Sequence, residues 1–481
     1  MLGAALGLVA PWNAVPGIFV VLAQTLAGSS MFVLGRRFFS AGPALFGAAC
    51  YAANPYALLL VYMRSDFAEE LACALLPLLL LAAVQLCGLL ENHWRSGTRV
   101  TAIFALLFAG VWLCNAPAGV VASYSLTLLL VYAALAEKSL APLWRGAGGL
   151  ALGFALAGFY LFPAAYEQPW VNIGQALSSG LQPVQNFLYT ATADPEHNAF
   201  NWIASSVAVL LVGMTAIVAL LARRTTENPE NEKVARRIWP VMVMLGAAAT
   251  ILMLRPSSIL WELVPKLRFV QFPWRWTGIL AVPYAYFAQA TFTRRRAGGI
   301  WIGVVILAAA GTATFLVRKA WWDSDDIPAL QDAIANGQGF DGTDEYDPAK
   351  DDHTDLPAKA PPVEILLAKG AQAPGPKAEI RTLRWTAEEK ELSITSPQPL
   401  RIAIRLLDYP GWRVEVNGRS VKPQSPETTA QMILPLSPGT HHIQIKFVRT
   451  TDRILGGCVS LLSLLAAVLL LSKRRARQRT T

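Results

Sequence analysis

The chain has 481 residues, of which 54% are hydrophobic and only 15% are charged. Soluble globular proteins have about 25% charged residues, and their apolar residues do not gather in blocks of about 20, the length that spans a bilayer. This composition excludes an ordinary soluble enzyme. The net charge of +9 does not indicate a nucleic-acid partner, because the basic residues are not concentrated on one water-facing segment.

About eleven apolar blocks predict membrane-spanning helices. In chain order they cover residues 14–35, 41–62, 67–90, 100–116, 117–136, 146–164, 202–222, 238–254, 277–293, 299–317 and 454–472. Basic residues gather on every second connection, whereas the loop 165–201 has no Lys or Arg. Because basic loops stay in the cytoplasm, we expect a cytoplasmic C-terminus and an N-terminus outside.

Residues 1–10 form an apolar stub that is too short to cross a bilayer. The stub also lacks the positive charge with which a signal peptide begins. We therefore expect the chain to start part-way through a larger protein, with at least one helix and one outer loop upstream.

A polar segment precedes the last apolar block. Its first part is rich in Asp, Pro and Gly and predicts loops, with one short helix near Ile327–Ala335. In its second part, hydrophobic and polar residues alternate, which predicts strands at 379–385, 391–395, 400–407, 412–416, 430–434 and 442–448. Asn417–Gly418 is typical of a two-residue hairpin turn. These strands predict a small antiparallel β-sandwich with Trp412 in or against its core.

The expected fold is therefore a polytopic α-helical membrane protein with an extracytoplasmic β-sandwich before its last helix. The expected parts are a transmembrane domain at 1–318, an irregular region at 319–377, the sandwich at 378–453, a helix at 454–472 and a basic cytoplasmic tail at 473–481.

The first group of candidate functional residues lies where the second apolar block ends and the third begins. Charge at a membrane boundary is costly and tends to be functional. Arg64, Asp66, Glu69 and Glu70 occur there, and the three acids share one helix face if the helix has started by Asp66. Two interpretations stay open: an acid or cation-binding cluster, or an interfacial turn with an Arg64–Asp66 pair and two solvated glutamates.

A second group lies in the outer loop before residue 277. Four basic residues lie in this loop, although basic residues normally stay on the cytoplasmic side. Five aromatic residues lie among them. The residues are Arg255, Lys266, Arg268 and Arg275, with Trp261, Phe269, Phe272, Trp274 and Trp276. Such a loop is suited to hold a phosphate while its rings lie along a lipid or a sugar. We favour ligand binding over the alternative, an aromatic belt with cations that reach the headgroups.

The loop from Glu167 to Asn201 adds carboxylates and aromatic side chains to the same side of the membrane. Together these side chains would suit a carbohydrate acceptor, whereas for any one of them an ordinary solvated loop is the favoured interpretation. They are Glu167, Asp194, Glu196 and His197, with Trp170, Phe187, Tyr189 and Trp202.

Several short strings, taken in order, resemble a known family. They are Asn54-Pro55-Tyr56, Arg64-Ser65-Asp66-Phe67-Ala68-Glu69, Phe159-Tyr160-Leu161-Phe162-Pro163-Ala164, Gln271-Phe272-Pro273-Trp274-Arg275, Gly342-Thr343-Asp344-Glu345-Tyr346-Asp347-Pro348 and Tyr409-Pro410-Gly411-Trp412. The chain resembles the membrane domain of bacterial 6-pyruvoyl-tetrahydropterin synthase-related proteins and their YfhO-like relatives. The clustered histidines that a zinc-dependent pterin synthase needs are absent from the sequence.

The resemblance implies kinship with the GT-C glycosyltransferases, which take sugar from a polyprenyl-phosphate carrier on the outer face of the bacterial inner membrane. Their catalytic acid usually lies in the first large outer loop, which here would precede Met1. Among the residues present, Asp66 and Glu69 are the expected catalytic bases. The residues expected to bind substrate are Arg64, Glu167, Arg268, Trp274, Arg275 and Glu345.

The expected partners are the bilayer, a polyprenyl-phosphate-linked sugar donor and an envelope glycan or lipid acceptor. The same carboxylates offer oxygen ligands for a divalent cation, which the reaction does not require. Two other functions stay open: a transporter or flippase of lipid-linked saccharides, and a non-catalytic envelope assembly protein.

Overall fold

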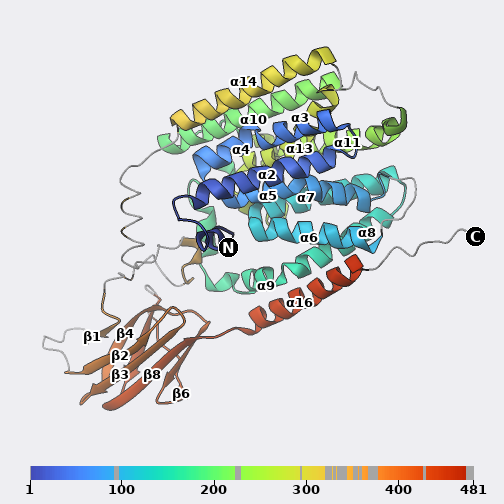
Figure 1. Cartoon of the computed structure of the whole chain (residues 1–481). Helices are drawn as coiled ribbons and strands as arrows, with labels where there is room; N and C mark the ends of the chain where they lie inside the picture. Colours follow the sequence, from blue (N-terminus) through green and yellow to red (C-terminus); the bar gives the residue numbers. More distant parts are fainter. Residues whose placement is uncertain are drawn as a thin grey trace, which may run out of the picture. The chain divides into compact units, whose positions relative to one another are not determined.

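The computed structural model of the chain is shown in Figure 1. It describes residues 2–90, 97–222, 229–292, 295–319, 344–349, 360–366, 377–425 and 430–472, together with the single residues 328, 332 and 356. The chain divides into two compact units. The membrane unit comprises Met1–Gly158, Leu177–Trp322 and Cys458–Thr481, and the β unit comprises Phe159–Ala176 and Asp323–Gly457.

Helices make up the described part of the membrane unit and lie side by side in Figure 1. The α-helices given by the described residues are α1 (Leu2–Gly7), α2 (Val15–Gly35), α3 (Ala41–Ala52), α4 (Pro55–Leu59), α5 (Phe67–Leu86), α6 (Thr98–Cys114), α7 (Ala116–Ala136), α8 (Ala141–Leu156), α9 (Gly158–Tyr166), α10 (Pro195–Ala222), α11 (Pro229–Leu252), α12 (Ser258–Leu263), α13 (Thr277–Phe292), α14 (Arg295–Lys319) and α16 (Thr451–Ser472). The shorter turns are a π-helix, η1 (Leu60–Arg64), and the 3₁₀ helices η2 (Gln168–Trp170), η3 (Ile173–Leu177), η4 (Pro183–Gln185), η5 (Arg255–Ser257), η6 (Leu267–Val270), η7 (Pro273–Trp276) and η8 (Asp344–Tyr346).

Six helical segments among the described residues are long and apolar enough to cross a membrane. They are Val15–Gly35, Ala41–Arg64, Phe67–Leu86, Ala116–Ala136, Pro195–Ala222 and Thr451–Ser472. Two bent pairs raise the number to eight if each is one span: α8 with α9, bent by 79°, and Arg237–Leu252 with Arg255–Leu263, bent by 89°. Each block expected from the sequence contains a helix, but α6 and α13 have only 17 and 16 residues.

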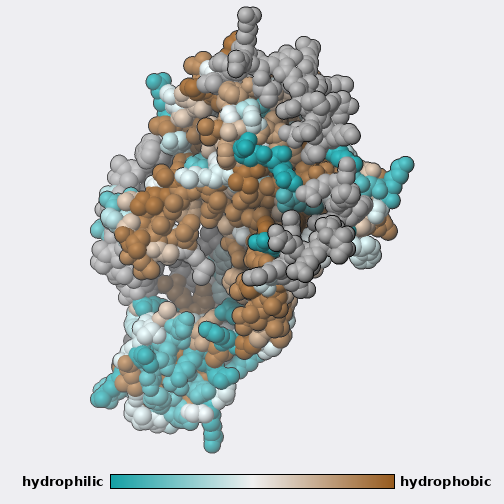
Figure 2. Space-filling view, turned by 45° about the vertical axis from the view of Figure 1, so that its right-hand side comes forward, coloured by the Kyte–Doolittle hydropathy of each residue, from teal (hydrophilic) through white to brown (hydrophobic). Residues whose placement is uncertain are grey.

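The interior of the membrane unit is built around α13, which is buried along almost its whole length and packs on α10, α3 and α11. Glycines allow α8 to lie close to α6, because a Cβ at Gly149 would come within 2.6 Å of the Phe104 ring. A Cβ at Gly153 would meet Phe108 at the same distance. Figure 2 shows hydrophobic side chains over much of this unit and hydrophilic ones over the β unit.

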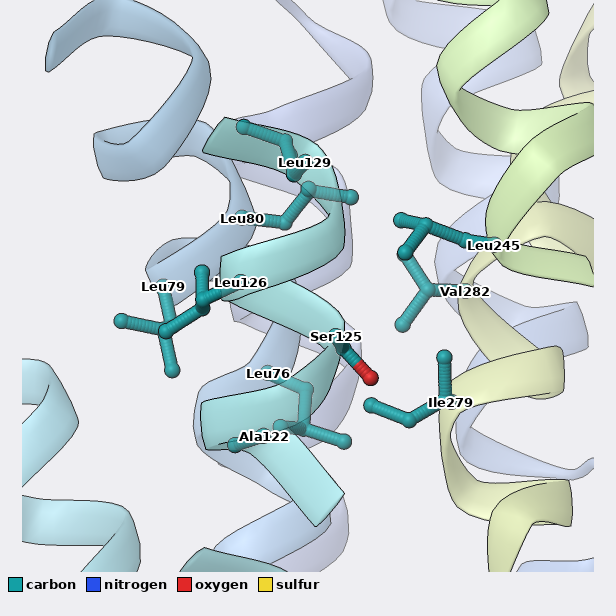
Figure 3. Close-up of a pocket in the computed structure, with 10 residues that line it drawn as sticks. All are labelled: Leu76, Leu79, Leu80, Ala122, Ser125, Leu126, Leu129, Leu245, Ile279 and Val282. Carbon is teal, nitrogen blue, oxygen red and sulfur yellow. The ribbon is translucent and has the colours of Figure 1, made fainter. Parts of the chain in front are cut away.

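An apolar space of about 30 Å³ lies inside the membrane unit. It is lined by residues of α5, α7, α11 and α13, and Figure 3 shows Ser125 as the polar side chain among them. The Ser125 hydroxyl donates to the carbonyl of Val121, 2.8 Å away, within its own helix. This space therefore has no charged group for a phosphate and is not a candidate site.

In the part of the β unit that the structure describes, the strands form two antiparallel sheets. Its strands are β1 (Val363–Leu366), β2 (Glu379–Trp385), β3 (Glu389–Ser396), β4 (Leu400–Leu407), β5 (Trp412–Val416), β6 (Arg419–Ser420), β7 (Gln431–Leu436) and β8 (Gly439–Phe447). The three-stranded sheet has the order β1-β4-β7, and the five-stranded sheet has the order β2-β3-β8-β5-β6. Asn417 and Gly418 both have positive φ, as the predicted hairpin turn requires.

The core of the β unit is formed by alternate residues of these strands, such as Leu392, Ile404, Leu434 and Ile443. Trp412 packs against this core, as the sequence predicts. Strand β1 falls in the region expected to be irregular and pairs Val363 with Ile404. Most of the short helix expected at 327–335 lies outside the described residues.

The β unit also includes a segment that the sequence assigns to the transmembrane domain. Residues 159–176 group with 323–457 rather than with the helices around them in sequence. The backbone N–H of Asn172 donates to the backbone carbonyl of Asp347 over 2.8 Å, and the backbone N–H of Ala349 donates to the backbone carbonyl of Trp170 over 2.9 Å. Backbone pairing thus joins the end of α9 to the segment around η8.

Candidate functional site

The first half of the candidate site is built by a break between two membrane-spanning segments. Asn54 caps α4 by accepting hydrogen bonds from the amides of Tyr56 and Ala57. Ser65 then ends η1 in the left-handed conformation, with a φ of 49°. Asp66 caps α5, its carboxylate accepting from the Glu69 amide at 3.0 Å. The break therefore places Arg64, Asp66 and Glu69 together at the start of α5.

The second half comes from the turn that leads into α13. Lys266 and Gln271 have φ values of 60° and 65°, so the chain turns sharply on either side of η6. Pro273 then starts η7, which ends in buried Trp274, Arg275 and Trp276. Arg275 is fixed from within this turn, because its Nη1 donates to the Val270 carbonyl at 2.9 Å.

The two halves meet in a buried ion network of two arginines and two carboxylates, Arg64, Asp66, Glu69 and Arg275. Arg64 lies 2.9 Å from Asp66 and 2.7 Å from Glu69. Arg275 lies 3.0 Å from Glu69 and 3.6 Å from Asp66. The Tyr56 hydroxyl donates a further hydrogen bond to Glu69. The four charges therefore balance, and each has a partner of opposite sign.

Aromatic rings cover the arginines of this network. The Arg64 guanidinium lies 4.8 Å from the centre of the Trp274 ring, and the Arg275 guanidinium lies 5.0 Å from that of Phe272. The sequence predicts that Trp274 binds substrate, with its ring along a lipid or a sugar. In the structure Trp274 is only 1% exposed, so its ring does not lie open to a ligand. In this structure it shields the network from its surroundings.

The two expected bases, Asp66 and Glu69, differ in their exposure and in their hydrogen-bond partners. The Glu69 side chain is 4% exposed and contacts two guanidinium groups and a hydroxyl, so both of its oxygens already have partners. The Asp66 side chain is 17% exposed, the largest value in the network. Burial raises the pKa of Asp66, and the charge of Glu69 raises it further, against the opposing effect of the arginines.

Arg268 does not join this network but lines a separate cleft in the membrane unit. The cleft has a volume of about 380 Å³, and its lining includes Phe187, Trp261, Glu262 and Arg268. The Arg268 guanidinium lies 5.3 Å from the centre of the Phe269 ring and forms no ion pair among the described residues. Arg268 is therefore available to a ligand, whereas the guanidinium of Arg275 is already occupied by protein atoms.

Glu167 and Glu345, the other two expected substrate-binding residues, belong to the β unit. Glu167 accepts from Arg453 at 2.7 and 2.8 Å and from the Tyr409 hydroxyl at 2.6 Å. The hydrogen bond from Arg453 lowers the pKa of Glu167 to about 2, and burial raises the pKa of Tyr409. Glu345 lies half-buried in η8.

These contacts change the two interpretations of the first group. The Arg64–Asp66 pair is present, but Glu69 and Glu70 are buried rather than solvated, with exposures of 3% and 4%. The sequence did not identify Tyr56 or Arg453 as partners, although Tyr56 lies in one of the family-like strings. Among the described residues, no group of three or more His, Cys, Asp or Glu is arranged to hold a metal ion.

Comparison with known proteins gives one match. The model of the 6-pyruvoyl-tetrahydropterin synthase related domain, a membrane protein family, matches residues 2–319, which is more than half of the chain. No curated protein and no solved structure matches. The matched range contains both halves of the ion network and the Arg268 cleft. The chain thus belongs to the 6-pyruvoyl-tetrahydropterin synthase related family of membrane proteins.

Proposed function

We propose that this chain is a membrane-embedded glycosyltransferase of the GT-C type, which transfers sugar from a polyprenyl-phosphate carrier to an envelope acceptor. The observation that carries the proposal is the position of Asp66. It is the most exposed carboxylate of a buried network and lies 2.9 Å from Arg64 and 3.6 Å from Arg275. Such a group can accept a proton while fixed cations hold its orientation.

In the proposed reaction, Asp66 takes the proton of the acceptor hydroxyl as the acceptor oxygen bonds to the anomeric carbon. The bond between that carbon and the phosphate oxygen breaks, and its electron pair leaves on the polyprenyl phosphate. The raised pKa of Asp66 makes its carboxylate a stronger base than an exposed aspartate. Glu69 acts as a positioning residue, because it holds both arginines beside Asp66.

The leaving phosphate is better assigned to Arg268 than to Arg275. Arg268 lines the 380 Å³ cleft with Trp261 and Phe187, which offer apolar surface to a sugar or a prenyl chain. Arg275 uses its guanidinium on Glu69, Asp66 and the Val270 carbonyl. Because Val270 ends η6, this hydrogen bond links the network to the turn that carries Arg268.

A non-catalytic assembly role is the competing function, and one observation favours it. Every charge of the network is paired within the protein, as expected for a group of side chains that only holds helices together. Activity measurements therefore have to decide between the two functions.

The test uses the full chain in lipid nanodiscs with polyprenyl phosphate that carries a radiolabelled sugar, and a bacterial envelope glycan fraction as acceptor. A transferase moves the label from the lipid to the glycan and releases an equal amount of polyprenyl phosphate. In liposomes, a flippase would carry the label across the bilayer without removing it from the lipid. If a folded protein does neither, the transferase proposal is wrong and the assembly role is the better account.

A further inference from the structure

Glu70, next to Glu69 in α5, is a buried carboxyl group that the proposed reaction does not use. The residue is 4% exposed and lies within the apolar segment Phe67–Leu86. It lines a space of about 20 Å³ together with Gln24 of α2, Tyr51 of α3 and Cys73 of α5. This space is large enough for one water molecule.

Neither carboxylate oxygen of Glu70 has a hydrogen-bond partner, although both are buried. Apart from the Gln24 side-chain amide, the hydroxyl and side-chain amide donors around the space are committed to other acceptors. The Tyr51 hydroxyl donates to the Cys73 carbonyl at 2.7 Å, and the side-chain amide of Asn54 donates to the Tyr51 carbonyl at 2.6 Å. The Tyr56 hydroxyl donates to Glu69. The Gln24 side-chain amide is therefore the donor left to stabilise a negative charge on Glu70.

The cations of the neighbouring network do not compensate such a charge either. Arg64 and Arg275 form their ion pairs with Asp66 and Glu69, and neither pairs with Glu70. The other titratable side chains that line the space are Tyr51, Tyr56 and Cys73. An unpaired carboxylate among membrane helices is costly, and proteins avoid this cost by neutralising the group.

The chemistry of Gln24 points to the neutralising species. Its side-chain amide lies beside the Glu70 carboxyl, and its Oε1 is also buried without a donor. A single proton on Glu70 would neutralise the carboxyl and also give Gln24 Oε1 a hydrogen bond. A metal ion would need more oxygen ligands than one carboxylate and one amide supply.

We propose that Glu70 is a proton-binding site within the helical bundle, held as a neutral carboxylic acid whose O–H donates to Gln24 Oε1. The proton exchanges with a water molecule that enters the 20 Å³ space, and its loss leaves an unpaired charge between α2 and α5. The site therefore makes the packing of these two helices dependent on proton binding. It does not depend on the glycosyltransferase activity proposed above.

Infrared spectroscopy of the full chain tests this proposal. The protein is kept in a maltoside detergent, which has no carbonyl group, near pH 7, where ordinary Asp and Glu side chains are ionised. We expect a C=O band of a protonated carboxyl that shifts in D₂O and disappears in Glu70→Gln. The matched control is Asp66→Asn, because Asp66 is a partly buried carboxyl close to Glu70 in the chain but is paired with Arg64.

Three results would overturn the proposal. The first is the absence of a carboxylic acid band in the wild type. The second is a band that Asp66→Asn removes and Glu70→Gln retains. The third is a sodium-dependent rise in Tm that Glu70→Gln abolishes, because it would show an ionised carboxylate with a bound metal ion. If Glu70→Gln does not fold, Gln24→Leu serves instead: the band must shift when its acceptor is lost, and an unchanged band contradicts the pairing.

Discussion

Asp66 in the membrane unit and Glu167 in the β unit are both carboxylates beside arginines, yet their pKa values move in opposite directions. Glu167 receives two hydrogen bonds from Arg453 and one from Tyr409, which stabilise its charge and lower its pKa to about 2. Asp66 shares its two arginines with Glu69, so burial dominates and raises its pKa. Burial and the neighbouring charge of Glu69, rather than the presence of an arginine, decide the outcome for Asp66.

This difference separates a structural carboxylate from a candidate base. Glu167 follows α9 and binds Arg453 at the start of α16, so it ties together two segments that are 286 residues apart in sequence. Its lone pairs are occupied, which leaves none for a substrate. Asp66 retains basicity and some exposure, which are the two properties that a general base needs.

The largest effect is expected from Glu69→Gln. Removing the charge that both arginines share leaves Asp66 as the only carboxylate among the described residues that pairs with the two buried guanidinium groups. Breaking a buried ion pair from one side costs about 3–5 kcal/mol. We expect the free energy of unfolding in detergent, measured by denaturant titration, to fall by this amount. Glu137→Gln is the matched control, because its pair with Arg237 is exposed, and an equal loss in both variants would contradict the proposed positioning role.

Asp66→Asn is expected to separate catalysis from stability. Asparagine caps a helix as well as aspartate does, so α5 should still start at the same residue. The amide cannot accept the proton of the acceptor hydroxyl, and kcat should fall roughly a hundredfold or more. Steady-state kinetics should show an almost unchanged KM for the lipid donor. An unchanged kcat would remove Asp66 from the reaction.

Glu167 should show its stabilising effect in the pH dependence of unfolding. Because its folded pKa is about 2 and its ordinary value is 4.5, the contribution is fully present above about pH 4.5 and is lost as the pH falls toward 2. We expect a Tm step in this window for the wild type and no such step for Glu167→Gln. Identical pH profiles would show that the Arg453 pair does not stabilise the protein.

The sequence predicts these two carboxylates unequally well, because their partners lie at different distances along the chain. Arg64 and Asp66 are near neighbours, so their pair could be expected from adjacency alone. Tyr409 lies 242 residues from Glu167, and no periodicity relates them.

The strands of the β unit are also predicted unequally well. Six strands are predicted by the alternation of hydrophobic and polar residues, whereas β1 lies in an Asp- and Pro-rich region where this pattern is too short to detect.

Arg268→Gln carries the smallest expected effect and tests the division of roles between the two arginines. Arg268 is free of ion pairs among the described residues and lines the cleft with Trp261, so its loss should weaken donor binding without destabilising the fold. Loss of one exposed charge contact with phosphate should weaken affinity about tenfold, which corresponds to about 1.4 kcal/mol. Binding of a fluorescent polyprenyl phosphate to nanodiscs measures this change. Arg268→Lys should recover only part of the affinity, because lysine lacks the planar fork that binds two phosphate oxygens.

A different result would assign the phosphate to Arg275. In that case Arg268→Gln binds the lipid as tightly as the wild type, while Arg275→Lys loses affinity and keeps its Tm. The ion network itself would then open to receive the donor.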